Sequence, residues 1–429
     1  MAQTSTMAPP RPSVGRFLEV RALTEQLAAP LSPEDQTAQS MPDVSPTKWH
    51  RAHTTWFFET FLLEPHWPGY QPYHPAYRYL FNSYYEGVGD PYPRAERGSV
   101  TRPGAAEVGT YRSAVDAAMV AMLAGGVSPD VARLLELGLH HEHQHQELLL
   151  MDIKHVLSCN PLLPAYAPGP GAASGPGAAS IEASWRLPAP GWISHDGGLV
   201  DVGHEGAGFC YDNETPVHRV NLRPFALADQ PVTCGEWMQF MADDGYQRAE
   251  LWLSDGWATV RREGWDSPLY WDGADGGWRI FTLTGQRPVD PAEPVCHVSY
   301  YEADAFARWA GARLPTEHEW EVVAPAVAVD ARRASTDDGP ALHCPPVRAG
   351  GTPPGSVWEW TSSAYGPYPG FRPAPGAVGE YNGKFMVNQQ VLRGGSCATP
   401  DGDRRPTYRN FFPPEARWVF SGLRLAHDA

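Results

Sequence analysis

A long helix predicted over about residues 129–157 constrains this chain most, because five of seven consecutive positions within it are histidine or glutamine. Ser128 is a good N-cap and Pro129 suits the first helical position, so the start of the helix is well marked. At about 3.6 residues per turn, His141 and His145 lie on one face, one turn apart. Two imidazoles in this arrangement can bind one metal ion.

The two histidines belong to a helically spaced stripe that includes leucines, which turns both imidazoles toward a core. The members of the stripe are Leu134, Gly138, His141, His145, Leu148 and Asp152. The six cysteines are scattered without a C-x-x-C pair, which disfavours a disulfide framework and a thiolate zinc site. Histidine and oxygen ligands must therefore hold any metal.

The same segment also spells H-E-x-x-H, the zinc peptidase signature in which Glu142 acts as general base. That interpretation needs a third ligand, and the next candidates, His155 and His195, lack a metzincin-like glycine turn. A purely structural interpretation, with the histidines satisfied by core partners, also stays open at this point.

Length and charge restrict the class of protein. A chain of 429 residues suits two or three domains. No apolar stretch approaches the length of a membrane span and the first residues are polar, so we expect a cytoplasmic protein without membrane contact. A net charge of -16 repels phosphate backbones, which makes nucleic acid an unexpected partner.

A Gly/Ala/Pro/Ser-rich stretch over 165–184, with a hexapeptide repeated in tandem, predicts a flexible linker. Before it, helical patterns over 15–164 predict a four-helix bundle, with helices beginning near Ser45 and running from Tyr111 to about residue 123. After it, 185–429 predicts an α+β domain. Its signals are strands over 217–220 and 225–228 and the capping boxes Ser299-x-x-Glu302 and Thr316-x-x-Glu319.

The bundle offers a third imidazole. In its first strongly patterned helix, His50 and His53 lie three residues apart, and His53 shares a face with Trp49, Trp56 and Phe57. On spacing alone, either histidine can meet the pair on the long helix.

Three motifs mark the first half of the chain: Trp49-His-Arg-Ala-His53-Thr-Thr-Trp-Phe-Phe-Glu59, Phe81-Asn-Ser-Tyr-Tyr-Glu-Gly-Val-Gly89 and His141-Glu-His-Gln-His145-Gln-Glu147. Five mark the second: Pro231-Val-Thr-Cys-Gly-Glu236, Arg313-Leu-Pro-Thr-Glu-His-Glu-Trp-Glu321, Val357-Trp-Glu-Trp-Thr361, Leu392-Arg-Gly-Gly-Ser396 and Gly422-Leu-Arg-Leu425. The first set resembles the DinB-like iron domain of ergothioneine-biosynthesis sulfoxide synthases. The second set resembles the formylglycine-generating-enzyme-like fold, which is related to C-type lectins.

The resemblance implies an oxidoreductase that uses Fe(II) and O2 to join cysteine, or γ-glutamylcysteine, to C2 of hercynine as a sulfoxide. The iron ligands of that family correspond to His53, His141 and His145. The resemblance therefore selects His53, and not His50, as the third ligand. Three neutral imidazoles on one side of an octahedral ion leave positions for two substrates and O2.

The resemblance also implies the remaining site residues. Gln144 and Trp418 are candidates for hercynine, whose quaternary ammonium favours aromatic faces. Arg94 and Arg97 resemble a clamp for the carboxylate of the thiol substrate. Tyr84 and Tyr85 are the candidate proton donors, and Tyr381 is the next candidate for that role.

Departures from relatives refine the expected substrate. The relatives that use γ-glutamylcysteine carry a Trp-Asp pair near the end, where this chain has the sequence 417–421 without it, so free cysteine is the expected donor. Cys397 follows Gly-Gly-Ser without a close partner, which argues against cysteine–copper chemistry in the second domain. Related ovothiol-type or selenium-transferring enzymes and a non-catalytic binding module remain alternatives.

Overall fold

The computed structural model describes residues 13–167, 190–206, 208–274, 277–327, 346–347, 352 and 354–429. The chain divides into two compact units. The first contains Met1–Pro161, Glu205–Asp212 and Arg372–Gly383, and the second contains Leu162–His204, Asn213–Phe371 and Lys384–Ala429. Most of the predicted linker over 165–184, including its repeated hexapeptide, lies outside the described residues. The domain boundaries drawn from the sequence stay a prediction.

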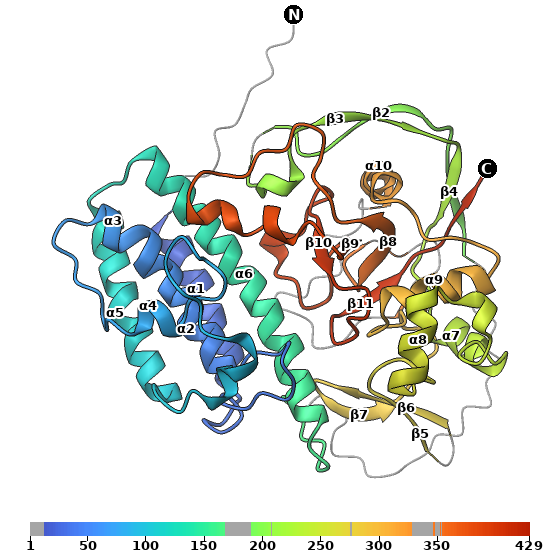
Figure 1. Ribbon diagram of the computed structural model, residues 1–429, viewed down its shortest axis with the longest axis horizontal. Helices are drawn as coiled ribbons and strands as arrows, with labels where there is room; N and C mark the ends of the chain where they lie inside the picture. The colour runs from blue at the N-terminus through green and yellow to red at the C-terminus, as the bar shows by residue number, and fades with distance from the viewer. Residues whose placement is uncertain are drawn as a thin grey trace, which may run out of the picture. The chain divides into compact units, whose positions relative to one another are not determined.

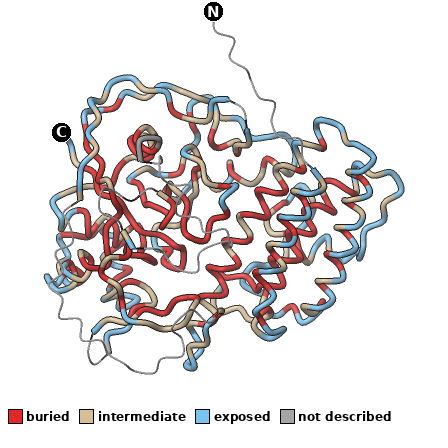
Figure 2. The backbone as a smooth tube through the Cα atoms, turned by 180° about the vertical axis from the view of Figure 1, so that it is seen from behind, coloured by how far each residue is buried: buried red, intermediate tan, exposed pale blue. Residues whose placement is uncertain are grey.

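The first unit is built on the four helices α1 (Val14–Ala28), α2 (Thr47–Phe58), α5 (Ala105–Ala124) and α6 (Pro129–Ser158), which lie side by side in Figure 1. Shorter turns fill the connections: η1 (Glu59–Leu63), α3 (Glu64–His66), α4 (Tyr77–Leu80) and η2 (Arg94–Ser99). Figure 2 shows the buried residues along the inward faces of the long helices. The predicted four-helix bundle is therefore present.

Local sequence explains where these helices begin. The Ser128 hydroxyl accepts a hydrogen bond from the Val131 amide, as the predicted N-cap requires. Helix α2 begins after Pro46 without a side-chain cap, and continues into a π-helical turn at Glu59–Leu63. Helix α1, which the sequence did not single out, has Ser13 as its N-cap.

In the part of the second unit that the structure describes, short sheets combine with four α-helices. Its strands are β1 (Trp192–His195), β2 (Gly198–Val202), β3 (His218–Leu222), β4 (Phe225–Ala228), β5 (Trp271–Ala274), β6 (Gly277–Thr282), β7 (Gly285–Pro288), β8 (Trp358–Ala364), β9 (Gln390–Arg393), β10 (Asn410–Phe412), β11 (Ser421–Leu423) and β12 (Ala426–Asp428). The α-helices are α7 (Cys234–Ala242), α8 (Ser254–Glu263), α9 (Tyr300–Trp309) and α10 (Glu317–Val327). Its single 3-10 turns are η4 (Ala249–Leu251) and η8 (Asp401–Asp403). The turn η6 (Ala377–Glu380) belongs to the first unit, and η3 (Asp212–Glu214) and η7 (Gly383–Phe385) each span a boundary between the units.

Two of the sheets connect distant parts of the chain. The order β1-β4-β12 places the last strand beside β4, and the order β10-β9-β8-β11 contains one parallel pair, β11 with β8. The remaining sheets are β2-β3 and β5-β6-β7. Both predicted strands and both predicted capping boxes are present.

Charged residues of the second set of motifs form buried ion pairs that tie this unit together. Arg393 binds Glu317 at 2.7 Å, and Arg424 binds Glu359 at 2.8 Å. Each ion pair joins residues of two different motifs, so these motifs meet in the buried part of the unit. Among the described residues, no helix is long and apolar enough to cross a membrane.

Candidate metal centre

Helices α2 and α6 bring three histidines together in the first unit. The possible ligand nitrogens of His53, His141 and His145 all lie within 4.8 Å of one another. His53 Nε2 is 3.2 Å from His141 Nε2. The structure thus groups the three residues that the resemblance selected as ligands.

A glycine allows the two helices to approach. Gly138 lies about one turn before His141 on α6, and a Cβ atom there would come within 2.7 Å of the Phe58 ring and 3.0 Å of the Phe57 ring. Real Cβ contacts are longer, so a side chain at this position would push α2 away. The close approach of the helices depends on this glycine.

The ring of His53 is fixed on every side. Its Nδ1 lies 2.6 Å from the Phe81 carbonyl oxygen, which can only accept, so Nδ1 carries the proton and Nε2 is left as a lone pair. Trp49 stacks on one face at 4.6 Å between ring centroids, and Trp56 stacks at 5.4 Å. The lone pair of Nε2 faces His141.

All three imidazoles are held neutral, as metal ligands must be. Burial lowers the pKa of His141 to about 3. Burial also lowers the pKa of His53 and of His145 well below the usual range, and the neighbouring histidines add to both shifts. A proton therefore does not compete with a cation at this site near neutral pH.

The spacing and chemistry fit a transition metal. Two nitrogens about 2.1 Å from one ion lie about 3.0 Å apart at right angles and about 3.4 Å apart in a tetrahedron. The observed 3.2 Å between His53 Nε2 and His141 Nε2 falls between these values. Neutral imidazoles suit iron, zinc, copper and nickel, so the donor set fits Fe(II) without selecting it.

Glu142, the acidic residue of the H-E-x-x-H pattern, is fully buried among cations. Arg21 and Arg112 bind its carboxylate, each at 2.9 Å, and Thr24 donates to it at 2.6 Å. Burial acts to raise the pKa of Glu142, but the two arginines outweigh that effect and lower it to about 2. A carboxylate bound in this way cannot serve as a general base, which argues against the peptidase interpretation.

The loop after α4 carries the two predicted proton donors. Asn82 holds the loop, because its amide oxygen accepts from the Tyr85 amide at 3.0 Å and its amide nitrogen donates to the Gly89 carbonyl at 2.8 Å. The Tyr84 hydroxyl donates to the Tyr85 hydroxyl at 3.2 Å. Burial raises the pKa of both phenols, so both stay protonated near neutral pH.

One aromatic ring separates these tyrosines from the histidines. Trp56 packs against Tyr85 at 5.6 Å between centroids and against His53 at 5.4 Å. Tyr381, the next candidate on the sequence, stacks on Tyr84 at 5.8 Å within the same unit. Glu380 anchors that segment by accepting from the backbone amides of residues 86 and 87.

The two clamp arginines differ sharply. Arg97 is only 4% exposed, its guanidinium lies 3.4 Å from the centroid of the Trp49 ring, and it donates to the Ser45 hydroxyl at 2.8 Å. Arg94 is exposed and donates to the backbone carbonyl of Asp43. Through Trp49, which stacks on His53, only Arg97 adjoins the histidines.

The two candidates for hercynine binding lie in different units. Gln144 is partly exposed on α6, between the two histidines of that helix. Trp418 is buried in the second unit, where its ring meets Phe412 edge to face at 5.8 Å. Their roles stay predictions.

Two further residues adjoin the histidines without having been selected from the sequence as site residues. His50 Nδ1 lies 2.9 Å from His145 Nδ1, and His50 Nε2 lies 3.0 Å from a carboxylate oxygen of Asp152. The sequence had offered His50 as an alternative to His53, and Asp152 was visible as a polar member of the α6 stripe.

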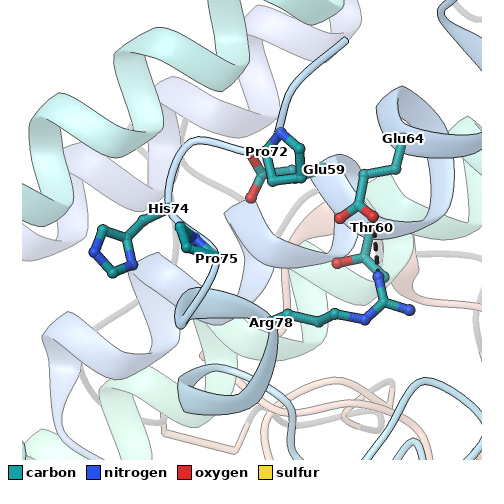
Figure 3. Close-up of a pocket in the computed structure, with 7 residues that line it drawn as sticks. All are labelled: Glu59, Thr60, Glu64, Pro72, His74, Pro75 and Arg78. Atoms are coloured by element: carbon teal, nitrogen blue, oxygen red, sulfur yellow. Dashed lines mark hydrogen bonds and ion pairs between the residues drawn. The ribbon is translucent and has the colours of Figure 1, made fainter.

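A pocket of about 180 Å³ lies elsewhere in the first unit (Figure 3). Its lining consists of Glu59, Thr60, Glu64, Pro72, His74, Pro75 and Arg78. None of these is a predicted site residue, and an ion pair of 2.9 Å joins Arg78 and Glu64 there.

Sequence comparisons bear on both units. Residues 16–149 match the DinB superfamily, and residues 178–338 and 354–429 match the sulfatase-modifying factor enzyme 1-like domain. These matches confirm the predicted helical DinB-like domain followed by a formylglycine-generating-enzyme-type α+β domain.

Two relatives align with this chain over most of its length. A hercynine oxygenase of Mycobacterium tuberculosis is 35% identical over 416 residues, which covers 90% of this chain and 92% of that protein. A hercynine oxygenase of Mycolicibacterium thermoresistibile is 33% identical over 421 residues, covering 90% and 88%. The solved structure of PvdO from Pseudomonas aeruginosa has 20% identity and a TM-score of 0.37, covering 56% of this chain and 95% of that one.

Proposed function

This chain belongs to the hercynine oxygenase family of oxidoreductases, and from that premise we propose that it joins cysteine to C2 of hercynine. The reaction consumes one O2. The ring loses C–H and the thiol loses S–H as the C–S bond forms, one oxygen atom enters the sulfoxide, and the other leaves as water. The product is hercynylcysteine sulfoxide.

The observation that supports this proposal most strongly is the group of three neutral imidazoles. His53, His141 and His145 would hold Fe(II), which supplies the activation of O2 when bound. Three imidazole ligands would leave up to three positions of an octahedral ion for substrates.

Of the two predicted clamp arginines, we propose that Arg97 binds the carboxylate of the thiol substrate, because Arg94 is exposed and donates to the Asp43 carbonyl. Arg97 is a buried cation, and no carboxylate pairs with it among the described residues. Burial, with the nearby Arg94, lowers the pKa of Arg97 to about 9, although the Asp152 carboxylate acts to raise it. An incoming carboxylate would pair with this buried charge.

Tyr84 and Tyr85 are the proposed source of the proton that directs the reaction to ring attack in place of sulfur oxidation alone. Both phenols are protonated, and their hydroxyls are hydrogen-bonded to each other. Gln144 and Trp418 are proposed to contact hercynine, through the ring and the quaternary ammonium respectively.

Free cysteine is the proposed donor, because the Trp-Asp pair of the relatives that use γ-glutamylcysteine is absent from 417–421. The test loads the protein anaerobically with Fe(II), adds hercynine with either thiol, admits O2 and identifies products by mass spectrometry. Sulfoxide formation that needs both substrates, and is faster with cysteine, is expected. O2 uptake independent of hercynine would contradict the proposal, and a clear preference for γ-glutamylcysteine would overturn the assigned donor.

A further inference from the structure

His50 lies directly behind one of the proposed ligands. Its Nδ1 is 2.9 Å from His145 Nδ1, and its Nε2 is 3.0 Å from Asp152 Oδ2. Both His50 and Asp152 are almost completely buried. The three side chains form a continuous hydrogen-bonded row, Asp152–His50–His145.

With both imidazoles neutral, the donors and acceptors allow one arrangement of protons along this row. A carboxylate only accepts, so His50 Nε2 carries a proton, and Nδ1 of the neutral ring is an acceptor. The bond between the two imidazoles then requires the proton of His145 to be on Nδ1. His145 Nε2 is then unprotonated and has a free lone pair, which is the state that can bind a metal ion.

The carboxylate is itself held in place. Asp152 Oδ2 also accepts a hydrogen bond of 2.8 Å from the Ser45 amide, just before α2. Asp152 lies two helical turns after His145 on α6, while His50 lies on α2, one turn before His53. Helix α2 thus supplies one proposed ligand and His50, and α6 supplies two proposed ligands and Asp152.

His53 has an equivalent support, since its Nδ1 donates to the Phe81 carbonyl. His141 Nδ1 has no hydrogen-bond partner among the described residues. Two of the three proposed ligands therefore have a hydrogen-bonded partner behind the ring, the Phe81 carbonyl for His53 and the His50–Asp152 pair for His145.

We propose that His50 and Asp152 are positioning residues that fix the tautomer and ring orientation of His145. This inference rests on the proposed histidine metal site. Hydrogen-bonded partners behind metal-binding histidines typically change metal affinity by about 10- to 100-fold. His50 is accordingly expected to matter for metal binding without being a ligand.

The test measures Fe(II) affinity by anaerobic titration and the absorption spectrum of the Co(II)-loaded protein. In His50→Asn, the amide oxygen can take the place of Nδ1 as acceptor, whereas His50→Phe keeps the ring volume but offers no acceptor. Asp152→Asn keeps the shape but removes the charge. His155→Gln, on the same helix but bonded to Ser40, is the matched control.

We expect His50→Phe to weaken Fe(II) binding by about 10- to 100-fold and alter the Co(II) spectrum. The Fe(II) affinity of His50→Asn should stay within a few-fold of that of the parent protein, and the affinity of Asp152→Asn should fall between those of His50→Asn and His50→Phe. His155→Gln should not change the Fe(II) affinity. A role limited to packing would give the opposite order for Phe and Asn. That order, or unchanged affinity in all three variants, overturns the proposal.

The same titration separates this inference from the proposed metal site. If His145→Ala abolishes binding while His50→Phe and Asp152→Asn bind normally, only the positioning role fails. If the parent protein binds no Fe(II), or His145→Ala binds as the parent does, the metal site itself is wrong. Melting curves of the apo variants show whether each one is folded.

Discussion

Replacing Arg97 with methionine should weaken the thiol substrate selectively. Methionine keeps much of the apolar stem that covers Trp49 and removes the guanidinium. A charge-assisted hydrogen bond is worth about 1.5–3 kcal/mol, so KM for cysteine should rise about 10- to 150-fold. KM for hercynine should change far less, because the residues proposed to contact hercynine are Gln144 and Trp418 and not Arg97.

The assay varies one substrate at saturating concentration of the other, following O2 uptake and product. Arg94→Met is the matched control: Arg94 is exposed and bonded to a backbone carbonyl, so its removal should change KM for cysteine by less than about fivefold. Iron content must be measured in both variants, because Trp49 links Arg97 to His53. Equal weakening of both substrates by Arg97→Met at normal iron content would refute the clamp.

Three further variants test other parts of the structure. Gly138→Ala should lower metal affinity and cost about 1–3 kcal/mol of stability, measured by titration and denaturant unfolding, because its Cβ would displace α2; gain of stability would contradict the packing argument. Glu142→Gln should destabilise the fold by up to about 3–5 kcal/mol, because Arg21 and Arg112 lose the fully buried anion that they share and keep only Asp116 and Glu25 as partners. Since the folded pKa of Glu142 is lowered to about 2, its contribution to stability is present above the unfolded pKa of about 4.5 and is lost as the pH falls through 2. The variant should therefore lose less stability than the parent between those pH values, and an unchanged acid-unfolding profile would contradict this. Phenylalanine at both Tyr84 and Tyr85 should leave the protein folded and iron-loaded but slow sulfoxide formation or shift the product toward cysteine sulfinate; an unchanged rate and product ratio by mass spectrometry would move the proton donor to Tyr381.

Patterns among residues that are close together in the sequence predicted much of the fold. The 3.6-residue period and the Ser128 cap gave α6 within one residue of its observed end. Strand β4 was bounded by the alternation of turn residues and apolar runs, and the capping boxes at Ser299 and Thr316 depend only on residues three apart. These features need no knowledge of distant contacts.

Other features depend on contacts between distant segments, which spacing does not encode. Spacing left His50 and His53 equivalent, and only the resemblance to known enzymes separated them. The structure distinguishes them by their partners, Phe81 for His53 and Asp152 for His50. The grouping of 372–383 with the helical unit was equally hidden, because it depends on contacts such as that of Glu380 with residues 86 and 87.

X-ray absorption at the iron edge of the anaerobically Fe(II)-loaded protein tests the central claim most directly. Three imidazole nitrogens per iron, from His53, His141 and His145, are expected in the absence of substrates. His53→Ala should lower the count or abolish binding, whereas His155→Gln should leave the spectrum unchanged. A parent spectrum without imidazole ligands, or an iron site that is identical in His53→Ala, would contradict the account.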